Sequence, residues 1–354
     1  MPLSHANHQV IPPEIDIPHA YNAAADLLGR HSHHPEKPAY IDASSGKSLS
    51  YAALNEQSHR FAQGLLSLGL QPEQRVLLCM HDGLPWPVVF LGCLLAGVVP
   101  VAVNTLLTSQ DYLYMLQDSR ARALLVSDAL WPVFAPVVDA SPDLTHIVSD
   151  EGKATPKGLS VASLIAHHDP LPSAAPTLSD DVCFWLYSSG STGSPKGTVH
   201  LHSHLIQTGE LYGRGVLGLR EDDVVFSAAK LFFAYGLGNA LTFPLTVGAT
   251  TVLLGKRPTP ADVFQVLVQH QPTVFYGVPT LFAGLLAHSE RPSASQLNLR
   301  VCTSAGEALP ADIGHKWSHE YGVDILDGIG STEMLHIFLS NQPGKVRYGT
   351  TGQA

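Results

Sequence analysis

Short apolar runs alternate with longer segments in which apolar residues recur every three or four positions. The runs predict buried strands, and the longer segments predict helices with one apolar face. In the first half of the chain, strands are expected at 75–80, 98–104 and 123–127, with helices at 87–96 and 109–119 between them. This alternation of strand and helix favours a mostly parallel sheet with helices on both faces.

The same alternation returns after residues 169–181, a stretch with three prolines that we interpret as a linker. A first lobe is therefore expected at 1–172, and a second lobe at 173–354. The predicted fold class is α/β, with two mostly parallel sheets flanked by helices. In the second lobe the expected strands are 182–187, 224–228, 250–254, 274–277, 299–304 and 324–327, and the expected helices are 204–212, 261–270, 280–288 and 311–321.

The composition narrows the range of partners. Hydrophobic residues make up 45% of the 354 positions and charged residues 14%, below the ordinary charged share of about 25%. The formal net charge of -10 argues against nucleic acid and against anionic membranes as partners. The four cysteines form no CxxC pair, so we expect buried thiols in a reducing cytoplasm. No basic region followed by an apolar one, as in a signal peptide, is visible at residues 1–16.

One segment imitates a membrane helix. Residues 86–103 run for eighteen positions without a charge, which is the lower limit for spanning a bilayer. The segment also contains Pro87, Gly92, Gly97 and Pro100, which would interrupt a long helix. A buried helix followed by a core strand is the favoured interpretation, and a membrane span is the alternative.

Candidate chemistry concentrates between Tyr187 and Gly197, directly after the apolar run 182–186. Glycines let this backbone bring its N–H groups close to a ligand, hydroxyls add neutral donors, and Lys196 adds a charge. Such a stretch favours a cradle for a polyphosphate, with a plain surface loop as the alternative. A Walker-type loop does not fit, because Lys196 lies between Pro195 and Gly197. The candidate ATP contacts here are Ser188, Ser189, Gly190, Ser191, Thr192, Gly193 and Lys196.

The eleven residues from Tyr187 to Gly197 resemble the phosphate-binding signature of the acyl-adenylate-forming superfamily. Residues 304–309 resemble its adenine-contacting segment, and residues 327–333 resemble its second nucleotide signature. The resemblance implies that Thr332 contacts phosphate and that Glu333 holds Mg²⁺, a hard cation that prefers oxygen ligands. By itself, a Thr-Glu pair more often begins a helix. The further ATP contacts that the resemblance implies are Ala305, Gly306, Glu307, Asp327, Gly328 and Thr332.

The segment 226–239 is similar to the part of these enzymes that builds the acyl pocket. Phe233 matches the aromatic or histidine residue that gates this pocket. Aromatic side chains beside Ala234 and two glycines leave a flat slot, which suits an aromatic ring better than a flexible chain. Plain core packing is the alternative for Phe232 and Leu237. The implied acid-binding residues are Phe233, Ala234, Tyr235, Ala305, Gly330 and Ile337.

Within the superfamily, the chain is most similar to the benzoate–CoA ligases along almost its full length. The runs 183–187, 229–239 and 333–338 carry this similarity. It implies that ATP and benzoate give benzoyl-AMP and pyrophosphate, after which CoA gives benzoyl-CoA and AMP. The resemblance assigns the catalytic roles to Thr332, Glu333 and Lys196, with Mg²⁺ as the metal.

Members of this family continue beyond the position of Ala354. Most of their barrel-like part and their small C-terminal domain would be missing, so we expect the 354-residue chain alone to be inactive as a ligase. The full-length protein is a possible homodimer. Ligases for 4-hydroxybenzoate, 2-aminobenzoate or hydroxycinnamate remain alternatives, and a noncatalytic module that binds a nucleotide or an aryl acid is an alternative of another class.

Overall fold

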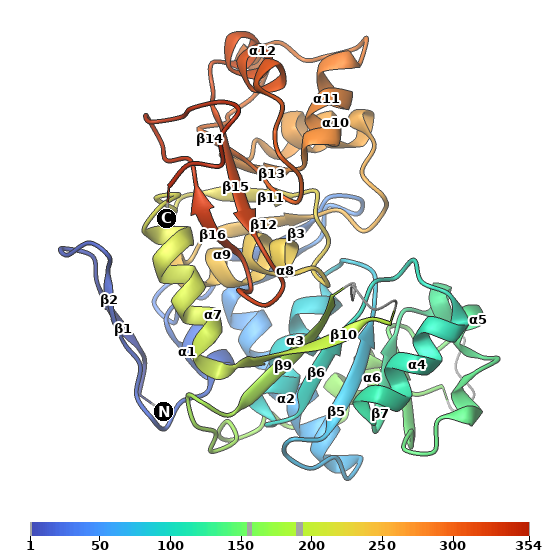
Figure 1. The fold of residues 1–354 in the computed structure, drawn as a ribbon. Coiled ribbons are helices and arrows are strands. Elements are labelled where there is room, and N and C mark those ends of the chain that lie inside the picture. Colours follow the sequence, from blue (N-terminus) through green and yellow to red (C-terminus); the bar gives the residue numbers. More distant parts are fainter. Residues whose placement is uncertain (1, 154–157, 189–193, 354) are drawn as a thin grey trace. The chain divides into compact units, whose positions relative to one another are not determined.

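The described residues form two large sheets with helices packed on them and one small two-stranded sheet (Figure 1). The computed structural model describes residues 2–153, 158–188 and 194–353. The chain divides into two compact units, each assembled from separate stretches of sequence. The first unit comprises Met1–His5, Asp16–Glu36 and Ser50–His204, and the second comprises Ala6–Ile15, Lys37–Leu49 and Leu205–Ala354.

The first unit contains a six-stranded sheet in the order β10-β9-β6-β5-β7-β8. All neighbours pair in parallel except β10, which runs antiparallel to β9 at one edge. The strands are β5 (Arg75–Cys79), β6 (Val99–Ala102), β7 (Ala123–Val126), β8 (His146–Ser149), β9 (Val182–Ser188) and β10 (Lys196–Leu201). The helices are α1 (Ala23–Gly29), α2 (Tyr51–Ser67), α3 (Pro85–Leu95), α4 (Ser109–Ser119), α5 (Trp131–Phe134) and α6 (Val161–Ala166). Helix α7 (His202–Thr208) begins in the first unit and ends in the second.

Helix α3 accounts for the uncharged stretch that imitates a membrane span. The helix has eleven residues, and every residue from Trp86 to Leu95 is buried. A helix that is apolar all round belongs in a core, and here α2 packs against it. No helix in the described part of the chain is long and apolar enough to cross a membrane.

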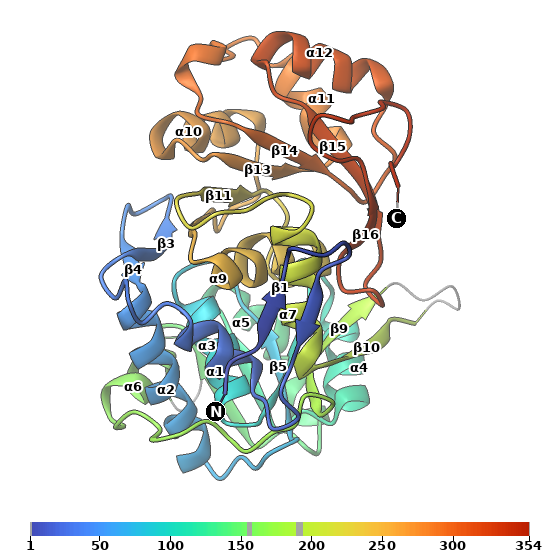
Figure 2. The ribbon, with the colours of Figure 1, turned by 90° about the vertical axis from the view of Figure 1, so that its left-hand side faces the viewer.

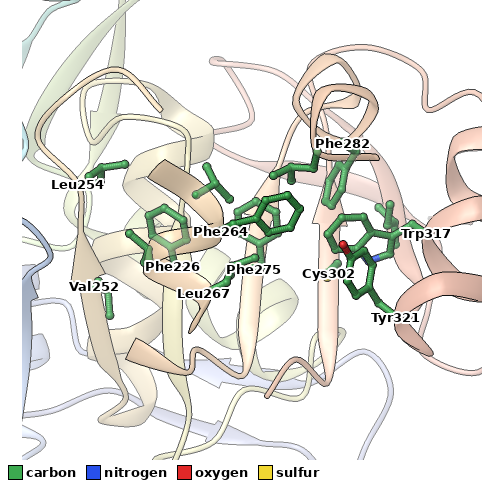
Figure 3. Packing of buried hydrophobic residues seen from close by; sticks show 14 of the residues in the cluster. Phe226, Val252, Leu254, Phe264, Leu267, Phe275, Phe282, Cys302, Trp317 and Tyr321 are labelled. Carbon is green, nitrogen blue, oxygen red and sulfur yellow. The ribbon is translucent and has the colours of Figure 1, made fainter. Parts of the chain in front are cut away.

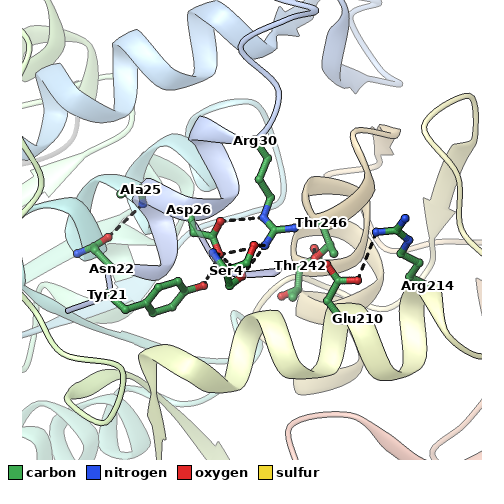
Figure 4. Close-up of polar contacts among 10 residues, drawn as sticks. All are labelled: Ser4, Tyr21, Asn22, Ala25, Asp26, Arg30, Glu210, Arg214, Thr242 and Thr246. Carbon is green, nitrogen blue, oxygen red and sulfur yellow. Dashed lines mark hydrogen bonds and ion pairs between the residues drawn. The ribbon is translucent and has the colours of Figure 1, made fainter. Parts of the chain in front are cut away.

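Buried polar contacts fasten the start of the chain to α1 (Figure 4). The Asp26 carboxylate accepts hydrogen bonds from Ser4 Oγ at 2.6 Å, Tyr21 Oη at 2.7 Å and Arg30 Nε at 2.8 Å. Asn22 caps the helix, because its side-chain oxygen accepts from two backbone N–H groups of the first turn. This first segment carries few apolar residues, and polar side chains therefore hold it in place.

The second unit contains an eight-stranded sheet in the order β16-β15-β14-β13-β11-β12-β3-β4. The strands are β3 (Pro38–Asp42), β4 (Ser48–Ser50), β11 (Val224–Ser227), β12 (Thr250–Leu253), β13 (Val274–Gly277), β14 (Val301–Ser304), β15 (Ile325–Gly330) and β16 (Ile337–Ser340). The helices are α8 (Ala234–Leu237), α9 (Phe243–Val247), α10 (Pro260–His270), α11 (Pro279–Ala287) and α12 (Ala311–Tyr321), and π-helices occupy Gly209–Arg214 and Gly238–Thr242. A separate two-stranded sheet joins β1 (His5–Asn7) and β2 (Glu14–Asp16).

One face of the second sheet is covered by α10, α11 and α12 (Figure 2). Alternate strand residues such as Phe226, Phe275 and Cys302 point into this core, where Phe282 and Trp317 meet them from the helices (Figure 3). Strands β11 to β15 run in parallel, so their carboxyl ends lie at a common edge. Ligands of open parallel sheets commonly bind outside that edge.

The predicted fold class is confirmed, with two mostly parallel sheets flanked by helices. The predicted division at residue 172 is wrong, because β9 pairs with β6 and so belongs to the first sheet. Residues 169–181 therefore lie inside the first unit and do not link two lobes. The strands β3 and β4, on either side of Gly46, extend the second sheet, where β3 pairs in parallel with β12.

Candidate active site

A cavity of about 700 Å³ opens at the carboxyl edge of the second sheet. Its walls come from the segments that follow β11, β12, β13, β14 and β15. All six predicted acid-binding residues line it, including Ala305, which is also a predicted nucleotide contact, together with two further predicted nucleotide contacts. These residues are Phe233, Ala234, Tyr235, Ala305, Gly330 and Ile337, and Gly306 and Thr332.

The wall after β11 is a compact turn that leads into α8. The Phe233 N–H donates to the Lys230 carbonyl at 3.0 Å. Gly236 packs on this turn so closely that a Cβ there would lie 2.0 Å from the Lys230 oxygen, so only glycine fits. Phe233 is 47% exposed and its ring centroid lies 4.5 Å from that of Phe232. The predicted gate residue is therefore an accessible aromatic side chain on the cavity wall.

Two aromatic rings on the cavity wall each have a polar atom that is paired with protein groups. Tyr235 Oη and Thr303 Oγ1 are 2.6 Å apart. His336 Nε2 lies 3.2 Å from the Tyr235 carbonyl and 3.0 Å from Asn239 Oδ1, so this nitrogen carries the hydrogen and donates. Burial lowers the pKa of His336 to about 3 and raises that of Tyr235. Both rings are therefore neutral at physiological pH.

The second predicted nucleotide signature begins on a buried strand and ends in an exposed turn. Asp327 is buried, and its Oδ2 accepts from the Leu309 N–H at 3.3 Å. Burial raises the pKa of Asp327 to about 6, against the lowering effect of backbone N–H groups. Gly328 is also buried, whereas Glu307 is exposed.

The turn after β15 presents the two residues for which the resemblance implies phosphate and metal roles. Thr332 lines the cavity and Glu333 is exposed beside it. The Leu335 N–H donates to the Thr332 carbonyl at 3.0 Å, which closes the turn. An exposed carboxylate next to a hydroxyl at a cavity mouth is a donor set that fits Mg²⁺.

The candidate phosphate loop belongs to the first unit. Ser188 ends β9 and Lys196 begins β10, and the two residues are paired in the antiparallel ladder. Lys196 is exposed. The Tyr114 hydroxyl donates to the Pro195 carbonyl at 3.1 Å and so anchors the loop's end. The other predicted contacts, Ser189, Gly190, Ser191, Thr192 and Gly193, lie outside the described residues.

Sequence reasoning assigned no role to several cavity residues. Arg257, Thr280 and Leu281 line the cavity and lie outside every motif, and Lys230 lies within the segment 226–239 but was given no role of its own. Each follows the carboxyl end of a parallel strand, and that position is the signal that could have found them.

Comparison with known proteins identifies the class. The AMP-binding enzyme family matches residues 29–354, so the chain belongs to that family. The chain is 57% identical over 354 residues to the benzoate–CoA ligase of Thauera aromatica, a match that covers 99% of this chain and 66% of that protein. It is 45% identical to the 4-hydroxybenzoate–CoA/benzoate–CoA ligase of Rhodopseudomonas palustris, over 94% of this chain and 61% of that protein.

A solved structure gives the same result for the fold. The benzoate CoA ligase from Burkholderia xenovorans LB400 superimposes with a TM-score of 0.89 at 51% identity, and the match covers 94% of this chain and 65% of that one. The chain therefore spans slightly less than two thirds of the length of the relatives it matches.

Proposed function

We propose that this chain is the acid-activating part of an aryl-acid–CoA ligase that acts on benzoate. The observation that carries the proposal is the cavity walled by Phe233, Tyr235 and Ile337, whose lining is mainly apolar. In the first step a benzoate oxygen attacks the α-phosphorus of ATP, and pyrophosphate leaves. In the second step the CoA thiol attacks the benzoyl carbonyl carbon and loses its proton, and AMP leaves.

The pocket favours an unsubstituted ring. Tyr235 Oη is paired with Thr303, His336 Nε2 is paired with two oxygens, and His336 Nδ1 is buried without a hydrogen-bond partner among the described residues. A ring hydroxyl that reached Tyr235 Oη or His336 Nε2 would lose water and find these two atoms already paired. An unpaired buried hydroxyl costs about 1–3 kcal/mol, which corresponds to roughly 5- to 150-fold in kcat/KM.

The nucleotide and the metal would be held by the residues for which the family resemblance implies these roles. In this proposal Ser188, the neighbouring loop residues 189–193 and Lys196 contact the phosphates of ATP. Thr332 contacts phosphate, and Glu333 holds Mg²⁺, which supplies charge neutralisation when bound. The adenosine contacts would come from Ala305, Gly306, Glu307, Asp327 and Gly328. No covalent protein intermediate is required, so positioning and electrostatic stabilisation are the protein's contribution.

Two measurements test the proposal separately. Calorimetric measurement of benzoate binding to the 354-residue chain tests the pocket. The ligase reaction is tested with the complete protein, by measuring pyrophosphate release that depends on the carboxylic acid and by measuring thioester formation. The acids compared are benzoate, 4-hydroxybenzoate, 2-aminobenzoate and a hydroxycinnamate. We expect benzoate to give the highest kcat/KM. A higher value for 4-hydroxybenzoate would favour the first alternative, and binding without pyrophosphate release would favour a noncatalytic module.

Three expectations from the sequence stay predictions. They are inactivity of the 354-residue chain alone as a ligase, a cytoplasmic location and a homodimer of the full-length protein. All four cysteines are buried and none forms a disulfide, which is compatible with a reducing compartment.

A further inference from the structure

A lysine ammonium joins the two segments that leave the carboxyl ends of β11 and β12. These strands are parallel neighbours, with Phe226 opposite Val252. The Nζ atom of Lys230, three residues after β11, donates to the backbone carbonyl of Leu254, directly after β12. It also lies 2.8 Å from the Lys256 carbonyl and 3.4 Å from the Gly255 carbonyl. Hydrogen bonds from an ammonium are stronger than those between neutral groups.

Both of the joined segments form walls of the cavity. The first contributes Ala229, Lys230 and Phe233, and the second continues directly into Arg257 and Pro258. The Lys230 backbone is also held tightly against Gly236. The backbone of the lysine is therefore fixed where its side chain reaches toward the second segment.

A second lysine makes the same kind of contact at the opposite edge of the same strand pair. Lys37 Nζ donates to the carbonyl of Gly248 at 2.6 Å, before β12, and to the carbonyl of Glu221, before β11. None of these three residues lines the cavity. Lys37 therefore provides an internal comparison, with the same chemistry on the same strands but away from the pocket.

We propose that Lys230 is a positioning residue that sets the width of the acid pocket by tying the segment after β11 to the segment after β12. The inference rests on the proposed function, because it assigns Lys230 to the acid-selecting wall of that site. The ammonium acts through the backbone of both segments and takes no part in the transfer steps. Loss of this contact lets the Arg257–Pro258 wall move away from Phe233.

The test compares Lys230→Met, Lys230→Arg and Lys37→Met in the complete enzyme. For Lys230→Met we expect the KM for benzoate to rise about tenfold with kcat within about threefold, the change expected when one charge-assisted contact is lost. Discrimination against 4-substituted benzoates should weaken. Lys230→Arg, which keeps a cationic donor, should restore part of the KM and of the discrimination.

The control separates positioning from stability. Lys37→Met should lower the melting temperature while KM and acid discrimination stay at the parental values. The inference is overturned if Lys230→Met keeps the parental KM and discrimination, or if Lys37→Met changes both as strongly. Should Lys230→Met fail to fold, Lys230→Gln takes its place with the same expectations.

A readout without substrate keeps this inference distinct from the proposed function. Hydrogen exchange of the amides at 255–257 should be faster in Lys230→Met than in the parent or in Lys37→Met. If the parent does not use benzoate but this exchange pattern is seen, the function is wrong and the contact between segments stands. Unchanged exchange refutes the positioning role whatever acid the enzyme uses.

Discussion

At the scale of single residues, Ala234 controls how much room the cavity has beside Tyr235. Ala234 is half-buried on the wall, and its small side chain leaves the slot open. Ala234→Leu adds apolar atoms to this space, and overpacking costs about 1–3 kcal/mol. We expect kcat/KM for benzoate to fall roughly 5- to 150-fold while the KM for ATP stays within about twofold.

The matched control is Ala287→Leu, the same change at an exposed position of α11. It should leave the kinetics with benzoate as they are. Unchanged benzoate kinetics in Ala234→Leu would remove this segment from the acid site and would leave core packing as its role.

Asp327 gives the protein an unusual dependence of stability on pH. Burial raises the pKa of Asp327 from 3.8 to about 6, so the folded state holds a proton that the unfolded state releases. The stabilisation is complete below pH 3.8 and is lost as the pH rises through 6. This contribution to the free energy of unfolding is roughly 2–3 kcal/mol.

Urea unfolding of the parent and of Asp327→Asn between pH 4 and 7.5 measures this effect. The stability difference between the two proteins should change by roughly 2–3 kcal/mol across that range, with the parent losing more as the pH rises. Parallel curves would mean that the carboxyl group is ionised in the folded protein at pH 5.

At the scale of elements, the sequence located most strands and helices. The helix predicted at 311–321 is observed at Ala311–Tyr321, and the strand predicted at 182–187 is observed at Val182–Ser188. Apolar periodicity is strong there, because these elements bury one face. Strand β10 was missed because its burial does not alternate cleanly and it begins at Lys196 within the candidate loop.

Helix α1 depends on polar contacts that no periodicity predicts. Arg30 compensates the buried carboxylate of Asp26, and Arg30→Met would leave that charge without its cation. Breaking a buried pair costs about 3–5 kcal/mol, and we expect about 3 because the Arg30 side chain is partly exposed. Urea unfolding measures the loss.

Lys316→Met breaks the exposed Lys316–Asp312 pair with the same spacing and should cost less than about 1 kcal/mol. Equal losses in both variants would contradict the buried network.

At the scale of the whole molecule, the sequence predicts the two large sheets and the kind of site, but not the division of the chain. Strand β3 lies beside β12, with Tyr40 opposite Thr251, more than two hundred positions away in sequence. Local periodicity carries no information about such distant pairing. The same limit explains the site: the motifs marked Thr332 and Tyr235, but Arg257 and Thr280 enter the cavity only through the order of the strands.

The two units have separate cores, and we expect their stabilities to respond separately. Phe282 is buried in the second unit between Phe275 and Trp317, with ring centroids 5.4 and 4.9 Å away. Phe134 is buried in the first unit, stacked on Tyr112 at 4.2 Å. Truncation of either ring to alanine leaves a cavity and costs about 3–5 kcal/mol.

Hydrogen exchange resolved by peptide then compares the reciprocal variants. Phe282→Ala should lower the protection of the amides in β11, β13 and β14 more than in β5 and β7, because the lost contacts belong to the core on that sheet. Phe134→Ala should show the opposite pattern, since its ring packs on β5 and β7. Equal loss of protection in both sheets from either variant would mean that the two cores open as one cooperative unit. The expectation that the two units respond separately would then be wrong.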